Sequence, residues 1–268
     1  PGPGGLAFSK DGNRAYLSHP EMGRISVIDT AKRDVVETFD VGGMPFAIAV
    51  DEGTDRRLIL FTDWKRNALV FVDPVSGAVI DLLATGKAPT AIAIDEERRR
   101  LYVANRDSGT LSILSADKPK LFARLETGRT PYALQLSTDG NQLYVADPRG
   151  NQVVVVDTGE DLVSRRIAVG HLPYGLAMTP DQKHLVVTNQ GDNNVSLLTL
   201  TKEQSATTSI KVGRDPDGVV VTTAGDKAWV ANWFDETLSL IDLDNQRELT
   251  TIDCAPGCRT IVRRPNSS

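Results

Sequence analysis

The chain has 268 residues, of which 40% are hydrophobic and 24% charged, and its formal net charge is −5. This length and apolar content suffice to bury a large core, and the acidic balance argues against general affinity for nucleic acid. No apolar run reaches the ~18 residues that a transmembrane helix requires, so we expect no membrane span. Composition does not change along the chain, which favours a single domain over residues 1–268.

A unit of about 43 residues recurs six times along the chain. The unit combines Gly-x-x-Pro, a short apolar run, a tight turn and two further strand-like segments. Its prolines are Pro3, Pro45, Pro89, Pro131, Pro173 and Pro216. The repeats cover about residues 1–41, 42–85, 86–127, 128–169, 170–212 and 213–253, and a tail follows at 254–268. Four strands in a period of about 40–45 residues are typical of a β-propeller blade.

The fourth repeat shows the expected elements most clearly. We expect strands at 132–137, 142–146, 152–157 and 164–169, with a tight turn at 138–141. No segment keeps a 3.6-residue apolar period over three turns, so almost no helix is expected. The predicted fold is therefore all-β, a β-propeller of four-stranded antiparallel blades.

Polar residues recur where the second and third strands end. The second strands end at His19, Asp63, Asn105, Asp147, Asn189 and Asn232. The third strands end at Asp29, Asp73, Ser115, Asp157, Thr199 and Asp242. We expect the aspartates of the second group to cap turns rather than to form a catalytic cluster.

The second strands carry a recognisable motif. Leu-Tyr-Val-Ala-Asn at 101–105 has counterparts at 143–147, 185–189 and 228–232. In this motif and in the Asp-terminated strand that follows it, the chain resembles the YVTN-repeat family of β-propellers over essentially its whole length. The first two repeats depart most, because His19 and Asp63 replace the asparagine. The resemblance implies a prokaryotic periplasmic or cell-surface propeller, and many such proteins have no assigned catalysis.

The number of blades depends on the tail. Six repeats predict six blades. Residues 258–264 fall where the first strand of a seventh blade would begin, so seven blades are the alternative if N-terminal strands are missing from this sequence.

The two cysteines, Cys254 and Cys258, enclose Ala-Pro-Gly near the end of the chain. Two close cysteines in a chain with no other thiol favour a small disulfide loop. A buried thiol pair and half of a metal site are the alternatives. The disulfide, together with the resemblance, predicts a periplasmic or extracellular location.

Topology predicts where a ligand binds. In a four-stranded meander the second-to-third and fourth-to-first connections emerge at the same end of the sheet, and loops on a rigid scaffold carry most binding sites. The candidate ligand-binding residues in these loops are His19, Phe46, Asp63, Trp64, Arg106, Tyr132, His171, Tyr174, Asp217 and Trp233. Their aromatic and cationic character suits a planar, peptide or sugar-like ligand. In the alternative, the strand-end Asn and Asp bond to nearby backbone and the aromatic rings pack between blades.

Catalytic motifs are missing from the sequence. It contains no Gly-x-Ser-x-Gly elbow, His-Glu-x-x-His or nucleotide-binding glycine motif. We therefore assign no catalytic and no metal-ligating residue and name no cofactor. An acid or base at His19 or His171, with a divalent ion at Asp63 or Asp217, remains the enzymatic alternative.

Three functions compete. The leading hypothesis is a non-enzymatic binding propeller that presents an aromatic and polar rim to a protein, peptide or small ligand whose identity is unknown. The second is an enzyme, either a metal-assisted lactonase or lyase or a cofactor-dependent protein. The third is single-stranded nucleic-acid binding through Trp64, Trp233, Tyr132 and Arg106. The acidic net charge counts against the third.

Overall fold

The computed structural model describes residues 2–53, 57–117, 120–200 and 205–265. They form two compact units, unit 1 with Pro1–Glu126 and Arg263–Ser268, and unit 2 with Thr127–Val262. Each unit contains three four-stranded antiparallel sheets whose strands follow one another in chain order. That all the repeats form one domain stays a prediction.

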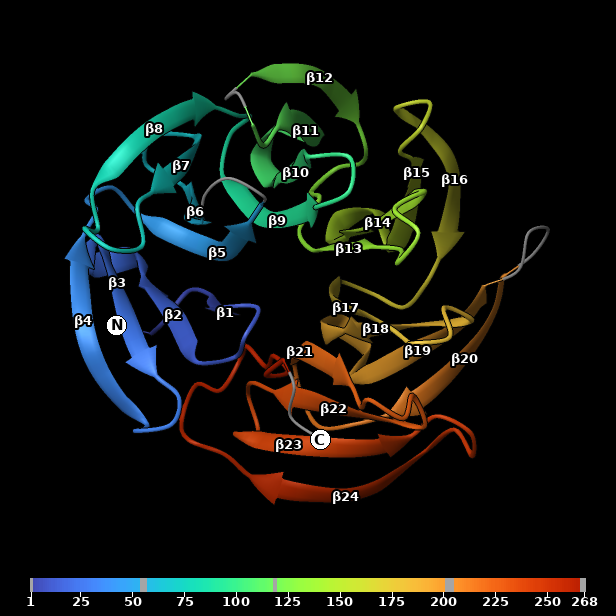
Figure 1. Ribbon diagram of the computed structural model, residues 1–268. Coiled ribbons are helices and arrows are strands. Elements are labelled where there is room, and N and C mark those ends of the chain that lie inside the picture. Colours follow the sequence, from blue (N-terminus) through green and yellow to red (C-terminus); the bar gives the residue numbers. More distant parts are fainter. Residues whose placement is uncertain (1, 54–56, 118–119, 201–204, 266–268) are drawn as a thin grey trace. The chain divides into compact units, whose positions relative to one another are not determined.

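The three sheets of unit 1 correspond to the first three repeats, coloured blue to green in Figure 1. The first sheet has strands β1 (Leu6–Phe8), β2 (Arg14–His19), β3 (Arg24–Asp29) and β4 (Asp34–Asp40). The second has β5 (Pro45–Glu52), β6 (Arg57–Asp63), β7 (Ala68–Val72) and β8 (Val79–Ala84). The third has β9 (Pro89–Asp95), β10 (Arg100–Asn105), β11 (Thr110–Ser115) and β12 (Leu121–Glu126).

Unit 2 repeats this plan with the last three repeats. Its first sheet has β13 (Leu134–Leu136), β14 (Gln142–Asp147), β15 (Gln152–Asp157) and β16 (Leu162–Ala168). The second has β17 (Pro173–Met178), β18 (His184–Asn189), β19 (Asn194–Leu200) and β20 (Ser205–Lys211). The third has β21 (Pro216–Val221), β22 (Lys227–Asn232), β23 (Thr237–Asp242) and β24 (Arg247–Asp253).

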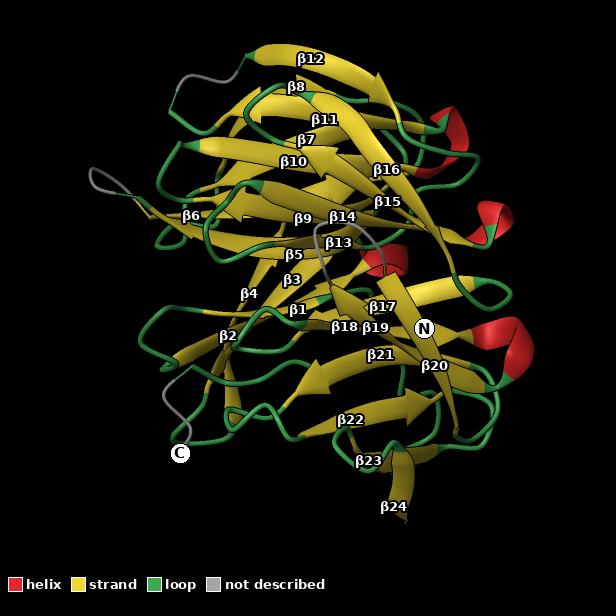
Figure 2. Cartoon of the chain, turned by 90° about the vertical axis from the view of Figure 1, so that its right-hand side faces the viewer, coloured by secondary structure: helices red, strands yellow, loops and turns green. Residues whose placement is uncertain are grey.

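Helix is confined, within the described residues, to four single 3₁₀ turns, which are red in Figure 2. Each turn directly follows a second strand: η1 (Pro20–Met22), η2 (Arg106–Ser108), η3 (Pro148–Gly150) and η4 (Gln190–Asp192). No helix among the described residues is long and apolar enough to cross a membrane. The predicted all-β propeller of six four-stranded antiparallel blades with almost no helix is confirmed.

The cores lie between consecutive blades. Successive residues of β6 belong to different clusters, because Ile59 and Phe61 pack with residues of the first blade and Leu58 and Leu60 with residues of the third. A strand that is buried on both faces needs apolar residues at every position. This explains the unbroken run Leu-Ile-Leu-Phe, and the same packing joins successive blades in unit 2.

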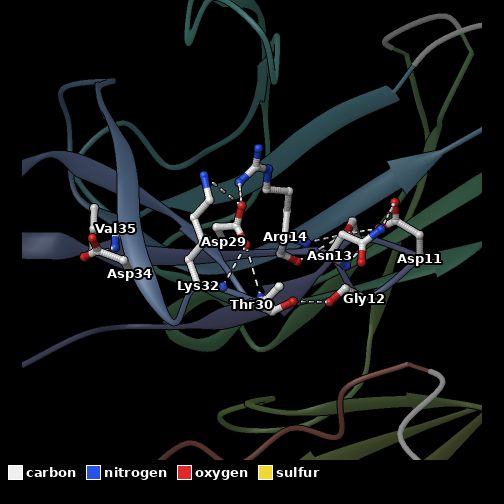
Figure 3. A network of polar contacts seen from close by, with 11 residues as sticks. Asp11, Gly12, Asn13, Arg14, Asp29, Thr30, Lys32, Asp34 and Val35 are labelled. Atoms are coloured by element: carbon white, nitrogen blue, oxygen red, sulfur yellow. Dashed lines mark hydrogen bonds and ion pairs between the residues drawn. The ribbon is translucent and has the colours of Figure 1, made fainter.

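The hairpin turns are closed by side chains, as Figure 3 shows for the first blade. Asp29 accepts hydrogen bonds from the backbone N–H groups of Ala31 and Lys32 and pairs with Arg14 at 3.0 Å. Thr30 donates from its hydroxyl to the carbonyl of Gly12, which joins the two hairpins of the blade. Asp73, Asp157 and Asp242 accept equivalent backbone bonds, so the prediction that these aspartates cap turns is confirmed.

The tail contains no strand within its described residues, but part of it lies where a further first strand would lie. The carbonyl of Arg259 accepts a 2.8 Å hydrogen bond from the N–H of Gly218 in β21. A Cβ added to Gly218 would meet this carbonyl, just as a Cβ added to Gly175 in β17 would meet the carbonyl of Asp217 in β21. Arg259 therefore contacts the first strand of the sixth blade in the same way as Asp217 contacts the first strand of the fifth blade.

Candidate functional site

The loops that follow the second and fourth strands lie at the same end of each sheet, because neighbouring strands are antiparallel. We call this the loop end. The opposite end carries the turns between the first and second strands and between the third and fourth strands, and we call it the hairpin end. All ten candidate ligand-binding residues belong to loop ends.

The asparagines that finish the second strands are structural. Asn105 accepts a 2.9 Å hydrogen bond from the N–H of Gly86 at its Oδ1 and donates from Nδ2 to Ser112 at 2.9 Å. Asn189 and Asn232 donate in the same way to a serine seven residues later. All three side chains are fully buried. They support the alternative in which strand-end polar residues bond to their own loop.

Asp63 is also engaged by its own loop. Its Oδ1 accepts hydrogen bonds from three backbone N–H groups, those of Met44, Lys65 and Arg66, at 3.1, 2.9 and 3.0 Å. Its Oδ2 pairs with the guanidinium of Arg66, and the residue is fully buried. An Asp63 carboxylate with these partners orders the loop and presents no surface to a ligand.

Three of the candidate residues come together in unit 1. The rings of Phe46 and Trp64 stack with centroids 4.1 Å apart, and the guanidinium of Arg106 lies 4.7 Å from the Trp64 ring. Trp64 also donates from Nε1 to the carbonyl of Pro89 at 2.7 Å. The stack therefore joins the loop ends of the second and third blades.

Unit 2 brings together four of the candidate residues and one further residue. The ring centroids of Tyr132 and Tyr174 lie 4.5 Å apart, and the rings are tilted relative to each other. Arg259 donates from Nε to Oδ2 of Asp217 at 2.7 Å, and its guanidinium lies 4.6 Å from the ring of Trp233. The result is a cation held between a carboxylate and an indole.

The charges of this group depend on each other. Burial raises the pKa of the Asp217 carboxyl, and the Arg259 guanidinium opposes that rise. Burial alone would lower the pKa of Arg259, but Asp217 and, more weakly, the Tyr132 and Tyr174 phenols outweigh burial and raise it. Arg259 is therefore a permanent cation at this loop end.

Arg259 is the residue that sequence reasoning missed, because the tail lies outside the six repeats. Its position could have been found from the period, since Asp217 follows Tyr174 by 43 residues and Arg259 follows Asp217 by 42. A second missed pair joins the loop before β21 to the loop after β22, because the guanidinium of Arg214 lies 4.2 Å from the ring of Phe234. Phe234 and Trp233 are adjacent and are 57% and 40% exposed.

The two candidate histidines have separate partners. His19 lies 2.9 Å from the hydroxyl of Ser26, and burial lowers the pKa of its ring. His171 is exposed and contacts Asp192 through Nδ1 at 2.8 Å. Across the described part of the chain, no group of three or more His, Cys, Asp or Glu side chains is arranged to hold a metal ion.

The structure joins Cys254 and Cys258 by a disulfide. The loop that it closes connects the end of β24 to the tail, immediately before Arg259. The backbone N–H of Cys254 donates to the carbonyl of Glu236 in the loop that carries Trp233 and Phe234.

A separate cavity of about 870 Å³ lies at the hairpin end of unit 2. The cavity is lined by residues of the fourth and fifth blades, counted along the chain, among them Gln142, Tyr144, Arg165, Gln182 and Leu200. The Tyr144 hydroxyl donates to Gln142 at 2.6 Å, and burial raises the pKa of the phenol. None of the candidate residues lines this cavity.

Comparison with solved structures supports the fold. Hydrazine synthase from Kuenenia stuttgartiensis aligns with a TM-score of 0.90 and 16% identity over 99% of this chain and 90% of its own. A streptogramin B lyase aligns with a TM-score of 0.81 and 14% identity over 97% and 86%. A functionally unknown protein from Desulfotomaculum acetoxidans DSM 771 aligns with a TM-score of 0.79 and 13% identity over 95% and 89%. At these identities the likeness concerns the fold alone.

Sequence comparison identifies the family. No curated protein sequence matches the chain. The resemblance to YVTN-repeat propellers stays a prediction. A model of the family described as lactonase, 7-bladed beta-propeller matches residues 1–160 and 123–221, which together make up most of the chain. The chain therefore belongs to the lactonase, 7-bladed β-propeller family.

Proposed function

We propose that the chain is a binding protein whose loop ends hold a planar or peptide ligand on aromatic rings that carry guanidinium groups. The observation that carries this proposal is the pair Trp233 and Phe234, two large adjacent rings that are 40% and 57% exposed. Exposed aromatic surface beside polar groups marks interaction sites. An arginine guanidinium already lies over each ring, so the side chains are ordered before a ligand binds and the entropic cost of binding is lower.

The test is a thermal-shift panel on the purified chain with aromatic acids, sugars, peptides, lactones and single-stranded oligonucleotides. A ligand at 100 times its dissociation constant stabilises the folded state by about 2.7 kcal/mol, which is easily measured. We expect the variant with Trp233→Ala and Phe234→Ala to lose the shift that the best ligand produces. Its melting temperature should stay within a few degrees of the wild type, because both rings are exposed.

Phe122→Ala provides the matched control. Phe122 is 51% exposed and has Arg100 5.9 Å from its ring, but it lies on the outer strand β12 rather than at a loop end. The control should keep the full ligand-induced shift. Equal shifts in the loop variant and the wild type would contradict the proposal. An oligonucleotide hit that weakens steeply with salt would instead favour nucleic-acid binding.

Hydrolysis of a lactone is the second candidate function, and the family description supports it. The chain's own residue for such chemistry is Asp217, a buried carboxyl beside a fixed guanidinium at a loop end. A pH-stat assay with γ- and δ-lactones tests it. Turnover that disappears in Asp217→Asn would establish the enzyme, and no turnover by the wild type would remove this candidate.

The location in a periplasmic or extracellular compartment remains part of the proposal. It is supported by the disulfide between the two cysteines of the chain. Alkylation of the protein in its native cells before lysis tests it. Modified Cys254 and Cys258 would show that the thiols are reduced there and would contradict the assignment.

A further inference from the structure

The guanidinium of Arg259 is bonded on one side only. Its Nε donates to Asp217 and its plane lies over Trp233, whereas neither of its two Nη atoms donates to any residue that the structure describes. The side chain is 43% exposed. The paired Nη edge of the guanidinium is therefore available to a ligand.

The surroundings of this edge are aromatic, and carboxylates lie close to it. Tyr132 and Tyr174 lie close enough to Arg259 to raise the pKa of its guanidinium, and the guanidinium lies over the ring of Trp233. Asp217 balances the single positive charge of Arg259. Asp215 adds a further negative charge that acts on Asp217, so a doubly charged phosphate would meet more repulsion here than a singly charged carboxylate.

The fork of an arginine matches a carboxylate in two parallel hydrogen bonds, and rings beside it stack on an aromatic group of the ligand. We propose that Arg259 binds the carboxylate of an aromatic carboxylic acid whose ring lies against the aromatic side chains of this loop end. The inference rests on the proposed binding function and names its ligand class. It also makes the tail a part of the binding site.

The disulfide supports this role for the tail. Cys254 and Cys258 close a five-residue loop that ends one residue before Arg259. In addition, the backbone carbonyl of Arg259 accepts a hydrogen bond from the backbone N–H of Gly218. Both restraints fix the backbone of Arg259 before a ligand binds, which lowers the entropic cost of binding.

The experiment is a ligand-observed NMR titration of the full chain with benzoate and with benzamide, its neutral analogue of the same shape. For the wild type we expect benzoate to bind about tenfold more tightly than benzamide, equal to about 1.4 kcal/mol. Arg259→Gln should remove this preference. Arg259→Lys should restore part of it, because lysine keeps the charge but lacks the fork.

Arg24→Gln is the matched control. Arg24 also donates from Nε to an aspartate, Asp40, at 2.7 Å, and its side chain is 45% exposed, but it belongs to the first blade and to none of the aromatic groups. It should keep the tenfold preference. Circular dichroism and a melting curve for each variant separate loss of binding from loss of folding, and Arg259→Lys remains informative if Arg259→Gln does not fold.

The outcomes separate this inference from the proposed function. A benzoate preference that persists in Arg259→Gln, or that falls equally in Arg24→Gln, overturns the role of Arg259. If neither probe binds the wild type but another class of ligand depends on Trp233 and Phe234, the binding function stands and the aromatic-acid inference is wrong. If no class depends on those two rings, the proposed function itself fails.

Discussion

At the scale of single residues, the last position of each second strand is occupied by His, Asp or Asn, and the hydrogen bonds differ with the residue. Asn105, Asn189 and Asn232 carry amide N–H groups, which need an acceptor, and a serine stands seven residues later in each case. Asp63 and Asp147 carry only acceptors, and at the same distance the chain has Val70 and Val154. These aspartates accept N–H groups from their loops instead. The asparagine N–H groups and the aspartate carboxylates thereby find partners, whereas Oδ1 of Asn189 and of Asn232 is buried without a hydrogen-bond partner among the described residues.

His19 is the only titratable base at this position, and its contact with Ser26 replaces the amide–serine bond. Because burial lowers the pKa of His19 in the folded state below the usual histidine value of about 6.5, the unfolded chain binds a proton more readily. The contribution of His19 to stability is therefore present above pH 6.5 and is lost as the pH falls through its folded pKa. The effect is small because the ring is only partly buried.

We expect His19→Asn to remove this pH dependence while keeping a donor for Ser26. The measurement is urea unfolding of both proteins at several pH values between 7.5 and 5.5. Carboxylates with lowered pKa, such as Asp11 at about 2, titrate below this window. The wild type should lose stability relative to the variant as the pH falls. Identical slopes for the two proteins would contradict the assignment.

At the scale of elements, the Gly-x-x-Pro loop and the second strand of the same blade constrain each other. A Cβ on Gly86 would lie 2.7 Å from both Cβ and Cγ of Asn105, which is fully buried and bonded to the Gly86 N–H. Gly213 approaches Asn232 in the same way, at 2.7 Å. The glycine of the motif is therefore required by a close approach.

Gly86→Ala should destabilise the fold by about 1–3 kcal/mol, the usual cost of overpacking. Gly159→Ala is the control, because its added Cβ would meet only Asp157 Oδ1, at 3.3 Å in an exposed hairpin, and its effect should stay within about 0.5 kcal/mol. Denaturant titration of the two variants measures the difference. Equal stabilities would show that the loop can move away from Asn105.

The sequence predicts the elements better than the contacts between them. The phase of the repeat and the runs of Val, Ile and Leu are enough to place strands such as Gln142–Asp147 and Gln152–Asp157 within a residue or two. The contact of Arg106 with Trp64 could not be predicted, since the two lie in different blades and their approach depends on how whole blades pack. The period could have placed Arg259 at the position that Asp217 holds one repeat earlier, but its contacts with Asp217 and Trp233 follow only from the folded structure.

At the scale of the whole molecule, one repeated sheet provides all the blades, and function is left to the loops. Second and third strands such as β10 and β7 are buried on both faces, whereas fourth strands such as β4, β8 and β24 are largely exposed. The loop ends differ, with a stacked Phe46, Trp64 and Arg106 in unit 1 and the Arg259 group in unit 2. This division predicts that ligands bind at loop ends rather than at hairpin ends.

The most direct test of that claim is hydrogen–deuterium exchange of the full chain with and without the best ligand from the thermal-shift panel. We expect slower exchange at 232–236 and 258–262, which carry the exposed rings and Arg259. The alternative site is the cavity of about 870 Å³ at the hairpin end of unit 2. Protection confined to 138–142 and 181–184, the hairpins at that cavity, would contradict binding at the loop ends.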